Sequence, residues 1–286
     1  MKKFGVLVAM LLTAALLFTG CAQQESFDPS NAIATVSREE GSGTRGAFVE
    51  LMGLEDEEGN DLTDVNADIA GSTSVMMTNV AGNPYAIGYI SLGSLDATVK
   101  AIKVDGVAAT VDEILAGNYK VSRPFNIAVK QDSLSEVAQD FVDYILSTEG
   151  QAVIEKAGYI PLSDTKAYAG SKPSGEIRVS GSSSVSPVME KLIEAYEALN
   201  TNASIQLQET DSTSGMNDAI EGRSDIGMAS RELKQSETGS GLTGIVIATD
   251  GIAVIVNKEN PIEDLSSEQI KKIFMGQAAS WEEFEG

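Results

Sequence analysis

A nine-residue run near the start of the chain carries side chains suited to holding an anion. Residues 37–45 read Ser-Arg-Glu-Glu-Gly-Ser-Gly-Thr-Arg, and an amphipathic stretch with Phe48, Leu51 and Met52 at helical spacing follows. Two glycines allow a tight turn that brings backbone N–H groups close to a ligand. The helix behind the turn directs its unpaired N–H groups and its dipole back at the loop. Arg38 adds a planar fork of donors suited to a tetrahedral oxyanion.

Two further segments combine a strand, a hydroxyl-rich turn and a helix start. Residues 181–187 read Gly-Ser-Ser-Ser-Val-Ser-Pro, and residues 211–215 read Asp-Ser-Thr-Ser-Gly. Ser, Thr and Asp are also preferred helix caps, so capping alone explains any one of these loops. Three such loops, one of them with an arginine, favour helix N-termini that converge on an anion.

The elements that must position these loops alternate between strands and helices. Runs rich in Val and Ile predict strands at 33–36, 86–90, 125–129, 177–179, 205–207 and 244–256. Apolar spacing predicts helices at 134–146, 151–157, 188–199 and 215–220. This alternation indicates an α/β protein with mostly parallel sheets. Residues 163–174 hold glycine, proline and small polar residues without an apolar period, and they are interpreted as a linker.

Composition narrows the class of protein. The chain has 286 residues, with 42% hydrophobic and 22% charged, which is typical of a globular protein. Histidine is absent and there is one cysteine, so the commonest general base and a thiolate metal cluster are excluded. The formal net charge of −22 disfavours a nucleic-acid binder. It still allows an anionic ligand, because a desolvated cleft binds an anion through local dipoles.

The first residues predict a leader rather than part of the fold. A basic start at 1–3 precedes an apolar run at 6–18, which is short for a membrane span. The run ends before Cys21 in a pattern that resembles a bacterial lipobox, with Phe18 where leucine is usual. We expect a signal peptide over 1–20, a lipidated Cys21, and a tether over 21–30. This places the protein on the extracytoplasmic face of the cell membrane.

Taken together, these motifs resemble the phosphate-binding lipoproteins of bacterial ABC importers. The resemblance covers nearly the whole mature chain. It is carried by residues 37–45, 181–187, 211–215, 224–231 and 247–251, with weaker matches at 86–89, 123–125 and 141–162.

The order of the matching segments differs from the order usual in that family. Residues 31–162 resemble its second half and precede residues 175–286, which resemble its first half. We interpret this as a circular permutation, with residues 163–174 joining the usual chain ends. A fragment of a tandem duplication or a rearranged gene is the alternative.

The resemblance implies a fold of the type II periplasmic-binding-protein kind. It has two lobes, each with a mixed sheet flanked by helices, and a ligand cleft between them. In the permuted order one lobe comprises residues 31–124 plus 250–286, and residues 125–249 form the other. The crossings between lobes fall near 123–126 and 249–251.

The resemblance also implies a set of phosphate ligands drawn from both lobes: Arg38, Ser42, Gly43, Thr44, Ser183, Ser184, Ser212 and Ser230. It implies supporting roles for Glu40, which would hold the arginine, and for Arg231 and Asp250. Arg231 would either latch the closed cleft or pair with a surface acid. Other polar residues have structural explanations: residues 72–74 are predicted to cap a helix, and Trp281 to pack near the C-terminus.

Ser230 departs from the family pattern. Some members have an aspartate there that accepts the proton of hydrogen phosphate, whereas a hydroxyl both donates and accepts. Glu39, Asp211 and Asp250 are the other candidates for a proton acceptor, although capping, a turn or the surface is the favoured explanation for each of them.

The function expected from the resemblance is reversible capture of phosphate, without chemistry, by a monomer that docks on an ABC permease. Sulfate, molybdate or tungstate binding, or a phosphate-sensing surface lipoprotein, are the alternatives. An enzyme is disfavoured, because the chain lacks histidine and its loop lacks the lysine of a Walker A motif. No cofactor and no metal are expected.

Overall fold

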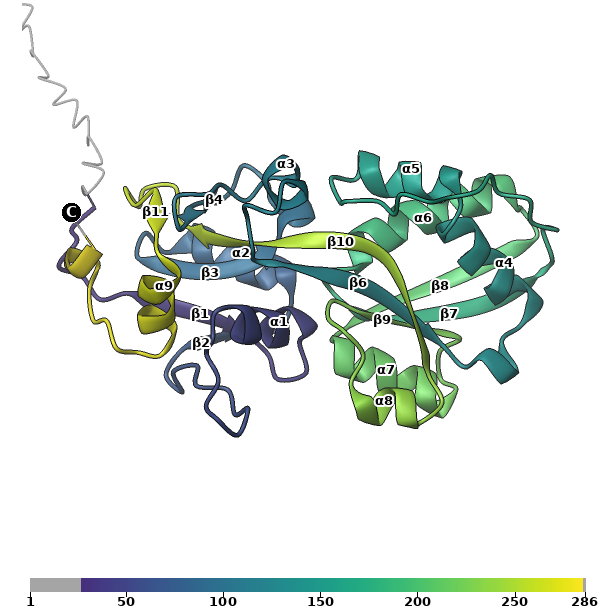
Figure 1. Ribbon diagram of the computed structural model, residues 1–286, viewed down its shortest axis with the longest axis horizontal. Coiled ribbons are helices and arrows are strands. Elements are labelled where there is room, and N and C mark those ends of the chain that lie inside the picture. The colour runs from purple at the N-terminus through teal and green to yellow at the C-terminus, as the bar shows by residue number, and fades with distance from the viewer. Residues whose placement is uncertain (1–26, 285–286) are drawn as a thin grey trace, which may run out of the picture.

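The computed structural model describes residues 27–284 of the chain (Figure 1). The molecule is elongated, with two halves side by side (Figure 1). Two long strands, β6 (Ser122–Val129) and β10 (Thr243–Val256), run together from one half into the other. The predicted signal peptide, the lipidated Cys21 and most of the tether lie outside the described residues.

One half, which we call the terminal half, has its buried apolar core built from residues 36–121 and 252–281. Its strands are β1 (Ala34–Arg38), β2 (Asp68–Ala70), β3 (Ala86–Ser91), β4 (Lys100–Ala101), β5 (Lys103–Val104) and β11 (Asp264–Leu265). Its helices are α1 (Gly43–Leu51), α2 (Thr73–Gly82), α3 (Val111–Leu115) and α9 (Ser267–Phe274), with 3-10 turns η1 (Leu92–Ser94) and η3 (Trp281–Phe284).

The other half, the central half, has a core built from residues 125–248. Its strands besides β6 and β10 are β7 (Gly175–Ser182), β8 (Ala203–Thr210) and β9 (Ile226–Ala229). Its helices are α4 (Glu136–Ile145), α5 (Thr148–Lys156), α6 (Ser186–Leu199), α7 (Ser212–Glu221) and α8 (Gln235–Gly239), with a 3-10 turn η2 (Gln131–Ser133).

Strand pairing joins the two halves. Over residues 27–284 nine strands hydrogen-bond in the order β2-β1-β3-β10-β6-β9-β7-β8, with β4 also on β10, and β5 pairs separately with β11. Pairs inside each half are parallel around β1 and β7, whereas β10 and β6 pair antiparallel with their neighbours. The two expected mixed sheets are therefore linked into one path. The reason is that β10 pairs with β6 along its first part and with β3 along its second.

Segments from opposite ends of the chain share the terminal half. The residues 252–256 of β10 pair with β3, and β11 pairs in parallel with β5. Phe274 packs edge-on against Phe48, with ring centroids 4.9 Å apart. Trp281 is fully buried and donates from Nε1 to the Tyr85 carbonyl at 3.0 Å. Trp281 is thus the packing residue that the sequence predicts.

Residues 163–174 form no helix or strand and lie along the central half. Asp140, which is buried on α4, accepts hydrogen bonds from the hydroxyls of Tyr168 at 2.5 Å and Tyr196 at 2.7 Å. It also accepts one from the Ser171 backbone N–H at 3.0 Å. The segment is therefore held against the helices.

Candidate functional site

The anion-binding loop that the sequence predicts connects β1 to α1. Arg38 ends β1, and Gly41 turns the chain with a φ of +90°, a conformation that favours glycine. The Ser42 side chain then caps α1 by accepting a hydrogen bond from the backbone N–H of Arg45 at 3.3 Å. Gly43 and Thr44 therefore occupy the first turn of α1, where backbone N–H groups point out of the helix.

Gly43 approaches the opposite half more closely than any side chain would permit. A Cβ atom at this position would lie 2.4 Å from Ser212 Oγ and 2.8 Å from Ser230 Oγ. Glycine at this position thus lets the two halves approach this closely without displacing the side chains of Ser212 and Ser230. The Gly41 carbonyl oxygen nearby accepts hydrogen bonds from Thr213, at 3.2 Å from its N–H and 3.1 Å from its hydroxyl.

The central half presents its hydroxyls from the carboxyl ends of three neighbouring strands. Ser182 ends β7, and Ser183 and Ser184 follow it before α6. Ser212 begins α7, with only the cap residue Asp211 between it and β8, and Ser230 follows β9. Because β7 is parallel to both β8 and β9, these strand ends meet at one edge of the sheet.

The two loops meet in a buried polar cluster. Thr44 Oγ1 lies 2.7 Å from Ser184 Oγ and 3.3 Å from Ser230 Oγ, and Arg38 Nη2 donates to Ser183 Oγ at 2.9 Å. These five side chains are between 0% and 3% exposed. The structure therefore brings together the predicted ligands Arg38, Gly43, Thr44, Ser183, Ser184, Ser212 and Ser230, while the hydroxyl of the eighth, Ser42, acts as the helix cap.

Hydroxyls in the central half are linked to one another. Ser182 Oγ donates to Ser230 Oγ at 2.9 Å, and the backbone N–H of Ser230 donates to Ser212 Oγ at 3.1 Å. Ser182 is a cluster member that the sequence analysis does not single out. Ser182 is the last residue of β7, so its side chain lies at the same end of the sheet as the loop that follows.

Arg38 is held by Glu39 and not by Glu40. Nε and Nη2 of Arg38 donate to the two carboxylate oxygens of Glu39, each at 2.7 Å. Glu40 is exposed. The expectation that Glu40 holds Arg38 is therefore wrong: β1 ends at Arg38, so the alternation of faces along a strand no longer applies to the residues that follow.

Thr73 is a cluster residue that sequence reasoning misses. Its Oγ1 lies 3.1 Å from Ser184 Oγ and 3.3 Å from Ser183 Oγ, and it accepts from Arg38 Nη1 at 3.3 Å. Ser72 caps α2, as predicted, by accepting from Val75 N–H. The available signal was a Gly-Ser-Thr-Ser sequence directly before a helix, the same combination that marks the other loops.

Asp250 lies on the crossing strands and pairs with Arg123. Arg123 Nη2 donates to Asp250 Oδ2 at 3.1 Å, the two residues sit opposite each other in the β6–β10 ladder, and both are buried. Burial raises the pKa of Asp250 to about 6, while the positive charge of Arg123 opposes this. The guanidinium of Arg123 has its own pKa lowered by burial. The carboxylate of Asp250 thus pairs with Arg123 on the neighbouring crossing strand rather than with the hydroxyl cluster.

Arg231 covers the cluster at the surface. Its guanidinium donates to both carboxylate oxygens of Glu237, at 2.9 and 2.7 Å, and to Thr213 Oγ1 at 3.2 Å. Its Cγ would lie 3.1 Å from a Cβ on Gly43, so the side-chain stem crosses the start of α1. Arg231 therefore pairs with an acid of its own half while it contacts the other half.

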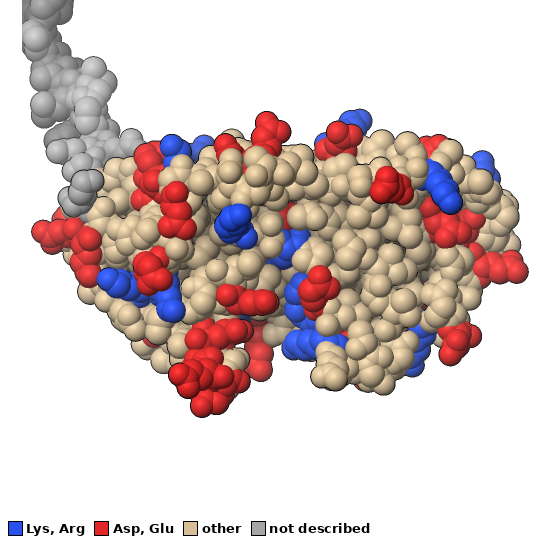
Figure 2. All heavy atoms as spheres, in the orientation of Figure 1, with Lys and Arg blue, Asp and Glu red and all other residues tan. Residues whose placement is uncertain are grey.

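A pocket of about 310 Å³ opens beside Arg231 at the junction of the two halves. Arg45, Arg231 and Lys234 line it together with Glu40 and Asp61. Figure 2 shows basic side chains along the groove between the halves, on a face where acidic side chains are spread widely. In a chain with a net charge of −22, three basic side chains beside two acidic ones give this pocket a local excess of positive charge.

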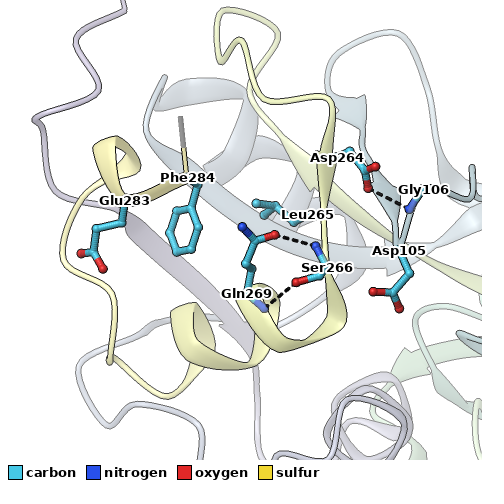
Figure 3. A pocket seen from close by; sticks show the side chains of 8 residues that line it. All are labelled: Asp105, Gly106, Asp264, Leu265, Ser266, Gln269, Glu283 and Phe284. Carbon is cyan, nitrogen blue, oxygen red and sulfur yellow. Dashed lines mark hydrogen bonds between the residues drawn. The ribbon is translucent and has the colours of Figure 1, made fainter. Parts of the chain in front are cut away.

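A second pocket, of about 480 Å³, lies away from the cluster in the terminal half and is drawn in Figure 3. Asp105, Asp264 and Glu283 line it with Gln269 and Phe284. The Asp264 carboxylate accepts a hydrogen bond from Gly106 N–H at 3.1 Å. Three carboxylates without a basic side chain in the lining make this pocket unsuited to an anion.

Within residues 27–284, no three His, Cys, Asp or Glu side chains are grouped so that they would hold a metal ion. Among the helices of that same range, none is both long and apolar enough to cross a membrane.

Comparison with known proteins identifies relatives of this chain. The PBP superfamily domain matches residues 19–149 and 166–286. Phosphate-binding protein PstS 2 of Streptococcus agalactiae serotype V is 50% identical over 288 residues, which cover 98% of both chains. The crystal structure of a phosphate-binding protein of a phosphate ABC transporter from Streptococcus pneumoniae TIGR4 is 42% identical. It superposes with a TM-score of 0.70 over 89% of this chain and all of the other.

A further group of relatives matches only in part. Phosphate-binding protein PstS of Staphylococcus haemolyticus is 35% identical over 116 residues, which cover 38% of this chain and 37% of the relative.

Proposed function

The chain belongs to the PBP superfamily and, within it, to the family of phosphate-binding proteins; we propose that it captures inorganic phosphate between its two halves and delivers it to an ABC transporter. The observation that carries the proposal is the buried cluster in which Arg38 and Thr44 meet Ser183 and Ser184. Arginine and hydroxyl donors from two halves suit a tetrahedral anion with four oxygens.

The proposed ligands divide between the halves. Arg38, Ser42, Gly43 and Thr44 act from the terminal half, and Ser183, Ser184, Ser212 and Ser230 act from the central half. Gly43 contributes its backbone N–H. Ser42 donates its own N–H to the Glu39 carbonyl oxygen at 3.2 Å and caps α1 with its hydroxyl, so it acts by shaping the turn. The starts of α1, α6 and α7 add the positive ends of their dipoles, so the anion does not require a cation for each oxygen.

Glu39 has a supporting role in this proposal. By accepting two hydrogen bonds from Arg38, its carboxylate fixes the guanidinium plane and leaves Nη1 and the second N–H of Nη2 for the cluster. The negative charge of Glu39 is thereby turned toward the arginine. This is the role that the resemblance assigned to the neighbouring acid, Glu40.

Capture and release proceed by movement of one half against the other. In the structure the two halves contact each other directly, with Thr44 Oγ1 2.7 Å from Ser184 Oγ. The two crossing strands, β6 and β10, are the connections about which the halves rotate. Arg231 acts as the clasp, because its stem crosses the start of α1 while Glu237 holds its guanidinium.

We propose the two halves as the two lobes: residues 31–124 with 250–286, and residues 125–249. The buried apolar residues form one cluster in the first of these lobes and two in the second, and none of the three clusters spans both, which supports this division. We also propose that the chain is a circular permutation. The relative from Streptococcus agalactiae has the same order along its whole length, and the partial match of other phosphate-binding proteins is what a permuted order would give.

The remaining parts of the proposal concern the surroundings of the protein. We propose that Cys21 is lipidated and holds the chain at the extracytoplasmic face of the membrane, and that the protein acts as a monomer and not as an enzyme. Its partner is the ABC permease, to which the closed form docks.

Titration calorimetry of the purified protein with phosphate tests the proposal. We expect wild-type protein to bind phosphate and the double variant Ser183→Ala with Thr44→Ala to lose binding without unfolding. The control is Thr201→Ala with Ser236→Ala, which removes two exposed hydroxyls of the same types. Equal phosphate affinity in both double variants would refute the site.

A further inference from the structure

Thr73 occupies a position that capping of α2 does not explain. It is the first residue of that ten-residue helix and is 5% exposed. The cap itself is Ser72, whose hydroxyl accepts from Val75 N–H at 3.3 Å. The hydroxyl of Thr73 therefore does not cap the helix. It lies beside the Ser183 and Ser184 side chains of the other half of the molecule.

The backbone of Thr73 also points into the cluster. Its N–H donates to Ser183 Oγ at 3.2 Å, and Arg38 Nη2 donates to the same oxygen at 2.9 Å. The first N–H groups of a helix have no partner within it, and they carry the positive end of its dipole. Two strong donors therefore converge on one hydroxyl oxygen, in the region where the proposed anion presents its oxygens.

The Thr73 side chain continues this pattern. Its Oγ1 lies 3.1 Å from Ser184 Oγ and 3.3 Å from Ser183 Oγ, both of them proposed ligands. It also accepts from Arg38 Nη1 at 3.3 Å, which leaves its own proton to donate elsewhere. A group that accepts from the ligand arginine and has a spare donor is placed to bridge that arginine and an anion oxygen.

We propose that Thr73 is a direct ligand of the bound phosphate, through its hydroxyl and its backbone N–H. The inference rests on the proposed function of the cluster and adds a residue that the resemblance does not assign. With it, the terminal half contributes two helix N-termini, those of α1 and α2. These face the two from the central half, α6 and α7, so four helices surround the anion.

Titration of three variants of the full chain with inorganic phosphate tests the assignment. Thr73→Val keeps the shape and removes the hydroxyl, and we expect it to weaken phosphate binding about ten- to a hundredfold, as for a hydrogen bond to a charged group. Thr73→Ser restores the hydroxyl and stays within about threefold of wild type. The matched control is Thr78→Val on the exposed side of the same helix, which leaves affinity unchanged.

A crystal structure of the phosphate complex separates a direct ligand from a residue that only orients Arg38. We expect Thr73 Oγ1 within about 3 Å of a phosphate oxygen. If Thr73→Val binds as tightly as wild type, or if Oγ1 contacts only Arg38 in the complex, the assignment falls and the proposed function stands. If wild-type protein does not bind phosphate, both are overturned.

Discussion

Arg38 and Ser183 lie 145 residues apart in the chain, and Arg38 Nη2 donates to Ser183 Oγ across 2.9 Å. Arg38 ends β1 in the terminal half, and Ser183 follows β7 in the central half. The contact joins the two halves at a point where both side chains are buried, 1% and 3% exposed. An arginine held at such an interface is a strong determinant of where an anion will sit.

The first prediction concerns which acid holds Arg38. Glu39→Gln leaves the buried guanidinium with an incomplete partner, and we expect it to lower the free energy of unfolding by about 1–3 kcal/mol. Glu40→Gln, on the next residue and exposed, changes it by less than about 0.5 kcal/mol. Chemical denaturation without phosphate measures both. Equal effects of the two variants would contradict the pairing seen in the structure.

The second prediction concerns Asp250 and pH. Burial raises the pKa of Asp250 from 3.8 to about 6 in the folded protein. The folded state therefore holds the proton more tightly, so the stability that this group contributes is present below 3.8 and is lost as pH rises to about 6. The pKa difference corresponds to roughly 3 kcal/mol at most.

The measurement is the stability of wild type minus that of Asp250→Asn, followed by denaturation across this pH range. We expect the difference to fall as pH rises and then to level off. Asp132→Asn, at an exposed position, is the control and gives a flat difference. A wild-type advantage that grows with pH would show that the Arg123 charge outweighs burial.

The third prediction concerns the choice of anion. Each of the three candidate carboxylates is engaged elsewhere: Glu39 by Arg38, Asp250 by Arg123, and Asp211 by the backbone N–H and hydroxyl of Ser214. The position where some members of the family have an aspartate is then filled by the hydroxyl of Ser230, itself a proposed ligand, which donates as well as accepts. A site of this kind has no fixed acceptor to repel an anion that lacks a proton.

We therefore expect sulfate to displace phosphate measurably, in competition calorimetry at about pH 6 and about pH 8, which bracket the range where phosphate changes charge. Ser230→Asp introduces a fixed acceptor and is expected to reduce sulfate binding more than phosphate binding. Complete rejection of sulfate by the wild-type protein at both pH values would show that another group discriminates.

The fourth prediction concerns the clasp. Arg231→Ala removes the stem that crosses the start of α1, and we expect phosphate to dissociate about tenfold faster. Lys234→Ala removes a positive charge from the pocket that Arg231 also lines, without opening the hydroxyl cluster. It should slow association in a salt-dependent way. Stopped-flow measurements distinguish the two variants. An unchanged dissociation rate in Arg231→Ala would show that Arg231 does not hold the two halves closed.

Much of the fold could be predicted from local patterns. Runs of Val and Ile at 86–90, 177–179 and 205–207 correspond to β3, β7 and β8, because such residues suit buried strands. The helix at 188–199 corresponds to α6 within two residues at its start. The short strands β5 and β11 have two residues each, too few for any periodicity to show.

The site could be predicted where glycine and hydroxyls combine in a loop before a helix. Thr73 could not be predicted as a site residue, because its contacts with Ser183 span 110 residues and depend on how the two halves meet. The pairing of Glu39 with Arg38 could not be predicted, because the end of β1 and the turn at Gly41, rather than residue spacing, set the direction of the Glu39 side chain. Both depend on tertiary geometry, which the order of residues does not reveal.

In the proposed site, phosphate is held by Arg38 together with hydroxyls of the opposite half. Calorimetric titration of Arg38→Ala with phosphate tests it most directly, beside Arg178→Ala, which removes an exposed arginine from the central half. We expect phosphate binding to be lost in Arg38→Ala and to equal that of wild type in Arg178→Ala, with both variants folded. Unchanged phosphate affinity in folded Arg38→Ala would contradict it.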